Sequence, residues 1–318
     1  MDASQLHTSV MLERCIELLA PAIERSSSPV VVDATLGLGG HSEGLLKRFP
    51  TLRLIGLDRD TEALRLAGER LAPFGDRVHV VHTVFDGIDS AIADLGIRRV
   101  DGVLFDLGVS SLQVDRVERG FSYSKDAPLD MRMDATGPVT AAQIIAEYDE
   151  SELRRIFHQY GEERLAARYA RRIVQERALH PIERSAQLVD IIQAATPAAV
   201  QRTGHPAKRV FQALRIEVNQ ELAVLERAIP RAIDALDIGG RIVVMSFQSL
   251  EDRIVKHILQ ARSQSTAPQG LPVELPEHRP ELRLLIRGAE MADDDEKMIN
   301  PRATSVRLRA AERVRGNS

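Results

Sequence analysis

The stretch VVVDATLGLGGHSEGLL, residues 30–46, joins a short apolar run to a glycine-rich turn and then to a helical pattern. The run ends at Asp33, and Gly37, Gly39 and Gly40 follow. Glycine permits positive φ and close approach of a ligand to the backbone, and the start of a helix points free N–H groups at the same space. We therefore expect a strand, a ligand-binding turn and a helix.

The same alternation of apolar runs and amphipathic stretches continues to residue 106, as in βαβ units. After it, residues 107–138 have no steady period, and the pattern is helical from Thr140 to about Arg202 and again from Ala207 to Leu236. Strands are predicted at 30–33, 53–58, 78–81, 101–106, 241–247, 282–287 and 305–310.

These elements predict an α/β fold: a seven-stranded, Rossmann-like sheet with an all-helical insertion after the fourth strand. The sheet domain is expected to comprise residues 1–108 and 217–318, and the inserted domain residues 109–216. The inserted domain is expected to recognise the substrate.

Composition narrows the class of protein. The 318-residue chain has one cysteine, Cys15, which excludes a disulfide framework and favours a reducing, cytoplasmic location. Its first residues do not read as a secretory signal, and no apolar run is long enough for a membrane span. The net charge is −4, yet residues 151–216 carry twelve Lys and Arg against six Asp and Glu. That basic segment indicates either a nucleic-acid partner or a solvated helical face.

Asp58 indicates which ligand the glycine turn accepts. It ends the second predicted strand about twenty residues after the turn, where a carboxylate can accept both hydroxyls of a ribose. Ser42 stands where a dinucleotide-binding turn has its third glycine. This departure favours an adenosyl cofactor without phosphates, such as S-adenosylmethionine, over NAD.

Three further residues fit that cofactor, although each also has a purely structural explanation. Asp33 and Asp106 end neighbouring predicted strands and would place negative potential near a sulfonium cation, or they cap turns. Phe85 follows the third predicted strand and would stack on an adenine, or it belongs to the core.

Several long blocks of sequence occur in a distinctive order. They are DATLGLGGHS (33–42), DRD (58–60), DLGVSS (106–111), RGFSY (119–123), PLDMRMD (128–134), HPAKRVFQALRIEVNQEL (205–222), SFQSLEDRIVK (246–256) and NPRATS (300–305). With these blocks the chain resembles the MraW/RsmH family of bacterial methyltransferases over nearly its whole length. The resemblance implies S-adenosylmethionine-dependent methylation of the exocyclic N(4) amine of a cytidine in 16S ribosomal RNA of the small ribosomal subunit.

The resemblance also implies a cofactor site in this sequence. Its residues are Gly37, Gly39, Gly40, His41, Ser42, Asp58, Phe85, Asp106 and Gln113. Two positions depart from the family. It usually has Pro where this chain has Leu112, and His where this chain has Gln248. Gln248 argues against an essential histidine acid–base role at that position.

Methyl transfer from a sulfonium is an in-line displacement, so alignment of the reacting atoms matters most. An exocyclic amine is a poor nucleophile and must lose a proton, which acceptors on its N–H groups assist. Asp106 and Ser110 are the catalytic candidates, because they follow the fourth strand. Methylation of a ring carbon through a cysteine adduct is disfavoured, since Cys15 lies on an apolar helical face. No metal-ligand cluster is expected.

Basic residues outside the sheet are candidates for contact with RNA. Lys208, Arg209 and Arg215 fall at helical spacing and would neutralise phosphates, unless they form salt bridges. Arg132 and Tyr123, in the long irregular stretch, would shape or cover the substrate pocket.

Three other functions remain open from the residues alone. They are a small-molecule methyltransferase whose insertion is a lid, a nicotinamide-dependent oxidoreductase, and a non-catalytic RNA-binding or assembly factor. The sequence does not decide between a monomer and a homodimer.

Overall fold

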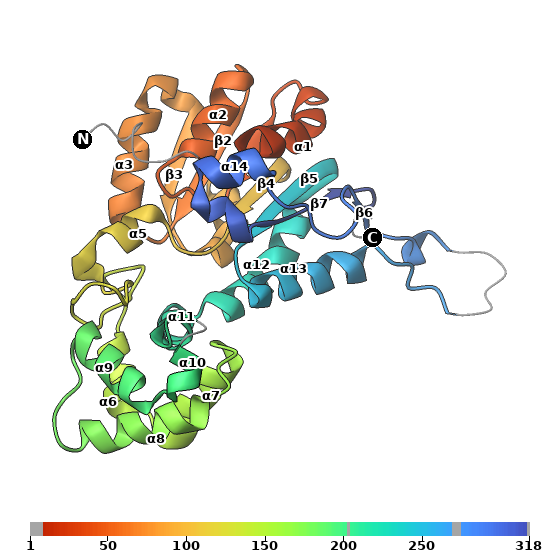
Figure 1. Ribbon diagram of the computed structural model, residues 1–318. Coiled ribbons are helices and arrows are strands. Elements are labelled where there is room, and N and C mark those ends of the chain that lie inside the picture. Colours follow the sequence, from red (N-terminus) through yellow and green to blue (C-terminus); the bar gives the residue numbers. More distant parts are fainter. Residues whose placement is uncertain (1–8, 202–203, 269–274, 317–318) are drawn as a thin grey trace. The chain divides into compact units, whose positions relative to one another are not determined.

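The computed structural model describes residues 9–201, 204–268 and 275–316, so Arg202 lies outside the described part (Figure 1). The chain divides into two compact units, Met1–Gly108 with Leu222–Ser318, and Val109–Glu221. The return boundary after Glu221 lies beyond the expected one because α11 (Ala207–Asn219) packs with helices of the second unit.

The first unit is built on one mixed sheet with the strand order β3-β2-β1-β4-β5-β7-β6. Neighbouring strands from β3 to β5 are parallel, whereas β7 pairs antiparallel with both β5 and β6. The predicted seven-stranded, Rossmann-like fold is confirmed. The strands are β1 (Val30–Asp33), β2 (Arg53–Asp58), β3 (Val78–His82), β4 (Val100–Asp106), β5 (Leu236–Ser246), β6 (Leu282–Leu284) and β7 (Arg307–Arg313).

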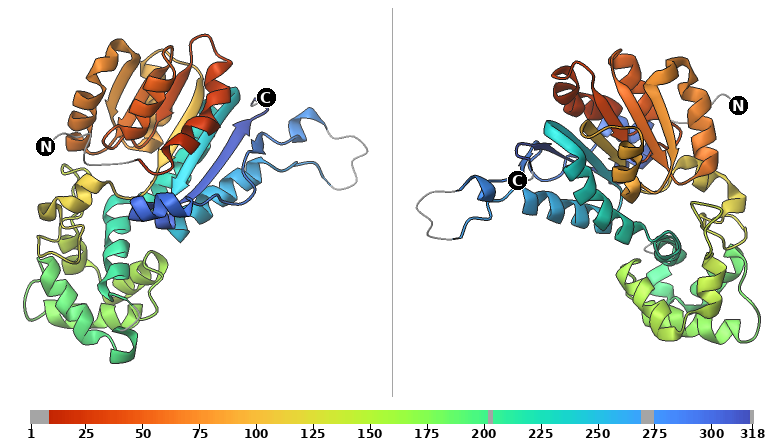
Figure 2. Two further views of the ribbon diagram at one scale, coloured as in Figure 1. Left: turned by 45° about the horizontal axis from the view of Figure 1, so that its top comes forward. Right: turned by 180° about the vertical axis from the view of Figure 1, so that it is seen from behind.

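Helices cover both faces of this sheet (Figures 1 and 2). Alternate residues of β1 point to opposite faces, so Val31 packs on one helical layer while Val30 and Val32 pack on the other. The layer facing Val31 contains α1 (Leu12–Glu24), α2 (Gly40–Arg48) and α3 (Thr61–Leu71). The opposite layer contains α4 (Ile88–Asp94), α12 (Glu221–Ala235) and α13 (Ser249–Arg262). Shorter elements of this unit are η2 (Ala72–Arg77), η3 (Phe85–Gly87), η5 (Pro276–His278), α14 (Asp294–Ile299) and η6 (Pro301–Ser305).

The second unit is helical, and the predicted insertion is confirmed. Its buried core includes Phe157, Tyr169 and Leu214, and a capping box of Asp149 and Glu152 starts α7. Its elements are α5 (Ser111–Asp115), η4 (Val117–Arg119), α6 (Ala141–Glu147), α7 (Glu150–Gln159), α8 (Ala166–Arg177), α9 (Ser185–Ala195), α10 (Ala198–Gln201) and α11.

Several boundary predictions were wrong, and the sixth and seventh strands span Leu282–Leu284 and Arg307–Arg313 rather than 282–287 and 305–310. The helix expected from Ala207 to Leu236 is interrupted at Gln220, whose φ of 51° is left-handed. The side chain of Gln220 donates to the carbonyl of Glu217, which competes with helix continuation. The fifth strand begins at Leu236 rather than 241, because Leu236 pairs with Val100 before an irregularity in register.

Among the described residues, no helix is long and apolar enough to cross a membrane.

Candidate functional site

Carboxylates end three adjacent parallel strands: Asp33 on β1, Asp58 on β2 and Asp106 on β4. In the sheet register Asp33 lies beside Gly56 of β2 and Leu104 of β4, so the three strands finish at one edge. We call these three residues the carboxylate edge. Connections leave β1 and β4 in opposite directions along the sheet, and ligands of open α/β sheets bind at such a point.

The glycine turn lies directly against this edge. The N–H of Gly37 donates to Asp58 Oδ2 at 2.8 Å, and Gly39 precedes α2 with a φ of 76°. Gly37 has a φ of 51°, and a Cβ built on it would meet nothing closer than the carbonyl oxygen of Thr35 at 3.8 Å. Conformation rather than crowding therefore requires glycine at position 37, and the space over its backbone is open to a ligand.

Asp58 keeps hydrogen-bonding capacity for a ligand. Its Oδ1 accepts the N–H of Asp60 at 2.9 Å, and its Oδ2 is already bonded to Gly37. A carboxylate has about four lone-pair positions, so each oxygen can accept one more donor. Burial raises the pKa of Asp58 to about 6, against the effect of its backbone hydrogen bonds.

Asp33 is the structural member of the edge. It is 2% exposed, and Ser42 Oγ donates to its Oδ2 at 2.6 Å while the N–H of Thr35 donates to its Oδ1 at 3.2 Å. Burial nevertheless raises its pKa. Ser42, which replaces a third glycine, thus ties the start of α2 to the end of β1.

His41 links the turn to Asp106. Its Nε2 must donate to the carbonyl of Val10 at 2.9 Å, because a carbonyl only accepts. Its Nδ1 lies 3.6 Å from Asp106 Oδ2.

Asp106, like Asp58, has a pKa raised toward the neutral range. Burial raises its pKa to about 6, whereas His41 and Arg302 act in the opposite direction. Its backbone N–H donates to Thr35 Oγ1 at 2.6 Å. Sequence reasoning missed Arg302, which comes from η6; the block NPRATS was the only signal for it.

The remaining cofactor candidates make local contacts within their own units. Phe85 packs edge-to-face on Phe105, with ring centroids 5.8 Å apart. Ser110 and Gln113 belong to the second unit, where they cap α5 reciprocally: Ser110 Oγ accepts the N–H of Gln113 at 3.3 Å, and Gln113 Oε1 accepts the N–H of Ser110 at 3.1 Å. Gln113 is 5% exposed.

The four candidate RNA contacts differ in their partners. Arg215 is bonded to both carboxylate oxygens of Glu221, and Arg132 to those of Asp130, so the structure uses these guanidinium groups internally. Arg209 is exposed and donates to a backbone carbonyl. Lys208 is exposed and forms no ion pair within the described ranges.

Gln248, where the family usually has His, precedes α13. Its Nε2 donates to Glu251 Oε1 at 3.0 Å, and Glu251 Oε2 accepts the N–H of Gln248 at 3.1 Å. The buried Oε1 of Gln248 and Oγ of Ser246 have no hydrogen-bond partner among the described residues. The amide therefore leaves an acceptor unused just beyond the end of β5.

Other features of the described chain do not belong to this edge. Cys15 is 1% exposed, as predicted, and burial raises the pKa of its thiol. No cluster of three or more His, Cys, Asp or Glu residues suited to a metal occurs in the described part.

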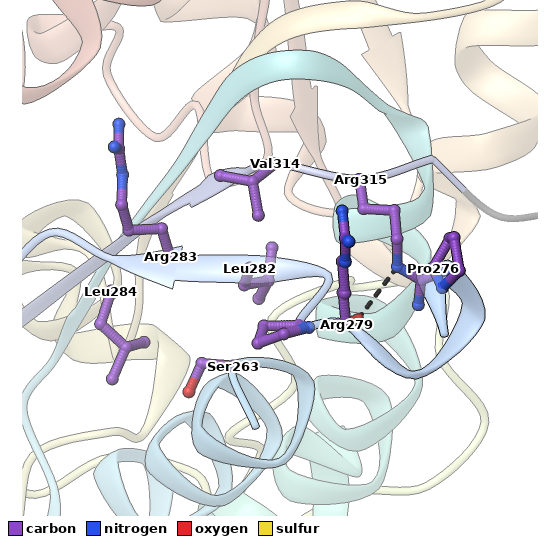
Figure 3. A pocket seen from close by; sticks show the side chains of 9 residues that line it. Ser263, Pro276, Arg279, Leu282, Arg283, Leu284, Val314 and Arg315 are labelled. Carbon is purple, nitrogen blue, oxygen red and sulfur yellow. Dashed lines mark hydrogen bonds between the residues drawn. The ribbon is translucent and has the colours of Figure 1, made fainter. Parts of the chain in front are cut away.

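A cavity of about 770 Å³ is bordered by Leu282, Arg279 and Arg315, where β7 ends (Figure 3). Because β7 runs antiparallel to β5, that cavity lies toward the opposite edge of the sheet.

Comparison with known proteins fixes the family. Residues 4–314 match the MraW methylase family. The ribosomal RNA small subunit methyltransferase H of Leifsonia xyli subsp. xyli is 72% identical over 98% of this chain and 96% of its own length. The protein of the same name from Clavibacter sepedonicus is 71% identical over 99% of both chains, and that from Saccharopolyspora erythraea is 60% identical over 99% of this chain and 95% of its own length. The chain belongs to the MraW methylase family.

Proposed function

We propose that this protein transfers the methyl group of S-adenosylmethionine to the exocyclic N(4) amine of a cytidine in 16S ribosomal RNA. Its near full-length similarity to small-subunit ribosomal RNA methyltransferases supports the substrate class. The observation that carries the chemistry is the carboxylate edge beside an open glycine turn. The N(4) position rests on the family resemblance.

The residues of the edge fit this cofactor. S-adenosylmethionine supplies a methyl group activated by a sulfonium sulfur. Asp58 would accept its ribose hydroxyls, and the turn at Gly37 together with the N–H groups at the start of α2 would receive its carboxylate. The negative potential of Asp33 and Asp106 would favour its cationic end. Phe85, His41, Ser42 and Gln113 complete the proposed set by family resemblance.

Asp106 is the proposed catalytic residue. An aromatic amine has little basicity because its lone pair is delocalised, so a carboxylate that accepts its N–H hydrogen bond increases its nucleophilicity. A pKa of about 6 leaves Asp106 mainly ionised at neutral pH yet able to hold the released proton. Ser110 is proposed as a second acceptor. Gln248, unlike a histidine, has no titratable ring with which to exchange a proton.

Lys208 and Arg209 are proposed to neutralise phosphates of the RNA, with smaller roles for Arg132 and Arg215, which have internal partners. The proposed location is the cytoplasm, where the small ribosomal subunit is found. Sedimentation of the purified protein would distinguish a homodimer from a monomer.

The direct experiment supplies labelled S-adenosylmethionine and small ribosomal subunits from cells that lack this protein. We expect label in the ribosomal RNA and, by mass spectrometry, N(4)-methylated cytidine. Absence of label despite cofactor binding would contradict the proposal and favour the lid or assembly-factor alternatives. Binding of NAD but not of S-adenosylmethionine in calorimetry would instead favour the oxidoreductase.

Asp58→Ala tests the cofactor assignment. Removing the ribose acceptor is expected to weaken S-adenosylmethionine binding by roughly 1–3 kcal/mol, the usual contribution of hydrogen bonds to a charged group. Calorimetry measures this loss, with the exposed Asp94→Ala variant as the control. Equal affinities for the two variants would refute the role of Asp58.

A further inference from the structure

Three aromatic rings form a column in the second unit, where the irregular loop meets the start of α11. The rings of Tyr123 and His205 stack with centroids 4.6 Å apart and planes inclined by 26°. Tyr123 also packs edge-to-face on Phe211, at 6.1 Å and 79°. Phe211 is 3% exposed, whereas His205 is exposed. The column therefore runs from the helical core to the surface and ends in an imidazole.

The imidazole of His205 is held in place by more than stacking. The N–H of Ala207 donates to its Nδ1 at 3.3 Å, which leaves the ring proton on Nε2, 3.3 Å from the side-chain amide of Gln193, whose oxygen can accept it when the amide is turned toward the ring. A ring fixed in this way loses little conformational entropy when a planar ligand stacks on it. These contacts make His205 a preorganised platform rather than a mobile surface side chain.

Positive charge flanks the platform. Lys208 is exposed, lies in the same turn, and has no ion-pair partner in the part of the chain that the structure describes. The guanidinium of Arg209, also exposed, bonds to the carbonyl oxygen of Glu162. Aromatic rings beside unpaired cations are typical of sites for single-stranded RNA, where a base stacks and the phosphates meet the cations.

We infer that the His205–Tyr123 stack is a binding platform for an unpaired base of the ribosomal RNA, next to the cytidine that is methylated or elsewhere in the same single-stranded segment. This inference rests on the proposed function and deepens it by assigning a base contact in addition to phosphate contacts. A base presented for methylation must be unstacked, so unpaired neighbours are available to such a platform.

Two substitutions separate stacking from the local hydrogen bond. His205→Asn keeps an acceptor for the N–H of Ala207 but removes the ring, and His205→Phe keeps a ring but removes the acceptor. Stacking of one base on an aromatic side chain predicts about tenfold weaker binding of small-subunit ribosomal RNA by the Asn variant, and affinity within about twofold of wild type for the Phe variant. The matched control is His180→Asn, an exposed histidine of the same unit outside the column, which is expected to bind normally.

Salt dependence and cofactor binding make the test specific. The slope of log affinity against log salt is expected to stay unchanged in both His205 variants, whereas Lys208→Ala lowers its magnitude by about one. Affinity for S-adenosylmethionine is expected to equal that of wild type in all three. Equal weakening of RNA binding by the Asn and Phe substitutions, or no weakening by Asn, would overturn the inference. Failure of the proposed function looks different: wild-type protein would then methylate no ribosomal RNA, whatever residue stands at position 205.

Discussion

Asp106 at the carboxylate edge and Asp130 in the second unit are both partly buried aspartates from distinctive sequence blocks, yet they are stabilised very differently. Burial raises the pKa of Asp106 to about 6. Burial acts in the same direction on Asp130, but the hydrogen bonds from Arg132 bring its pKa below the ordinary value. A carboxylate to which no arginine is hydrogen-bonded is a candidate for chemistry, whereas one bonded to arginine through both oxygens holds the fold.

Loop 119–137 shows how far that internal bonding extends. Arg119 donates to the carbonyls of Arg132 and Met133, and the side chain of Asn219 accepts the N–H of Met133 at 2.7 Å while donating to the carbonyl of Met131 at 2.8 Å. Backbone groups of Met131, Arg132 and Met133 are thus bonded to the side chains of Arg119 and Asn219. The comparison teaches that a distinctive motif can be scaffold rather than site.

The largest expected difference between the two regions is in catalysis. Asp106→Asn should lower the rate of methyl transfer by about 10²-fold or more, the usual effect of losing a general base, while the protein stays folded. Asp130→Asn should instead lower stability and leave the rate of the folded fraction near that of wild type. Single-turnover kinetics and circular dichroism on both variants measure the two effects, and a slow but stable Asp130→Asn together with a fast but unstable Asp106→Asn would contradict the assigned roles.

Asn219→Ala tests the scaffold role of the second unit. Loss of the side chain leaves the N–H of Met133 and the carbonyl of Met131 buried without this partner, so we expect about 3 kcal/mol of destabilisation. Chemical denaturation measures it, and cofactor affinity should not change. A loss below about 0.5 kcal/mol, as at ordinary surface sites, would show that the loop does not depend on Asn219.

Asp106→Asn should also stabilise the protein, but only at higher pH. A pKa raised from 3.8 to about 6 means that the folded state binds the proton more tightly than the unfolded state, so wild-type stability falls as pH rises between these values. The variant lacks this loss. With 30% of the side chain exposed, we expect a gain of about 2 kcal/mol above pH 6 and none below about pH 4. Denaturation curves at several pH values measure this gain. A gain that does not change with pH would contradict the effect of the raised pKa.

The smallest effect concerns the basic residues. Lys208→Ala should weaken RNA binding by about 1 kcal/mol or less and reduce the salt slope, because one phosphate contact is lost. Lys125 is an exposed lysine of the same unit, so the Lys125→Ala variant removes the same charge and serves as the control. Identical salt slopes for the two variants would mean that Lys208 makes no phosphate contact of its own and adds only to the net positive charge of the protein.

Much of the sheet was predictable because its strands are buried on both faces. Val30–Asp33 and Arg53–Asp58 appear in the sequence as apolar runs ending in an acid, and the structure has the predicted bounds. The positions of Asp33, Asp58 and Asp106 at one edge follow from parallel pairing alone. Sequence patterns thus located the edge and its glycine turn.

Interactions between distant segments were not predictable in this way. Arg302 influences Asp106 although it lies far along the chain, and periodicity contains no information on such proximity. Arg132 and Arg215 looked like surface cations, but their carboxylate partners occupy them. The left-handed Gln220 was missed because its side-chain bond to Glu217, rather than any glycine or proline, ends the helix.

The place of β7 in the sheet has a consequence for biosynthesis. β6 pairs only with β7 among the described strands, and β7 also covers one side of β5. The sheet therefore remains unfinished until residues 307–313 have left the translating ribosome, and the backbone N–H and C=O groups along that edge of β5 stay unpaired during that time. A premature stop codon just before Arg307 would remove β7 and leave β6 without its partner strand, so this truncation would be far more damaging than its length suggests.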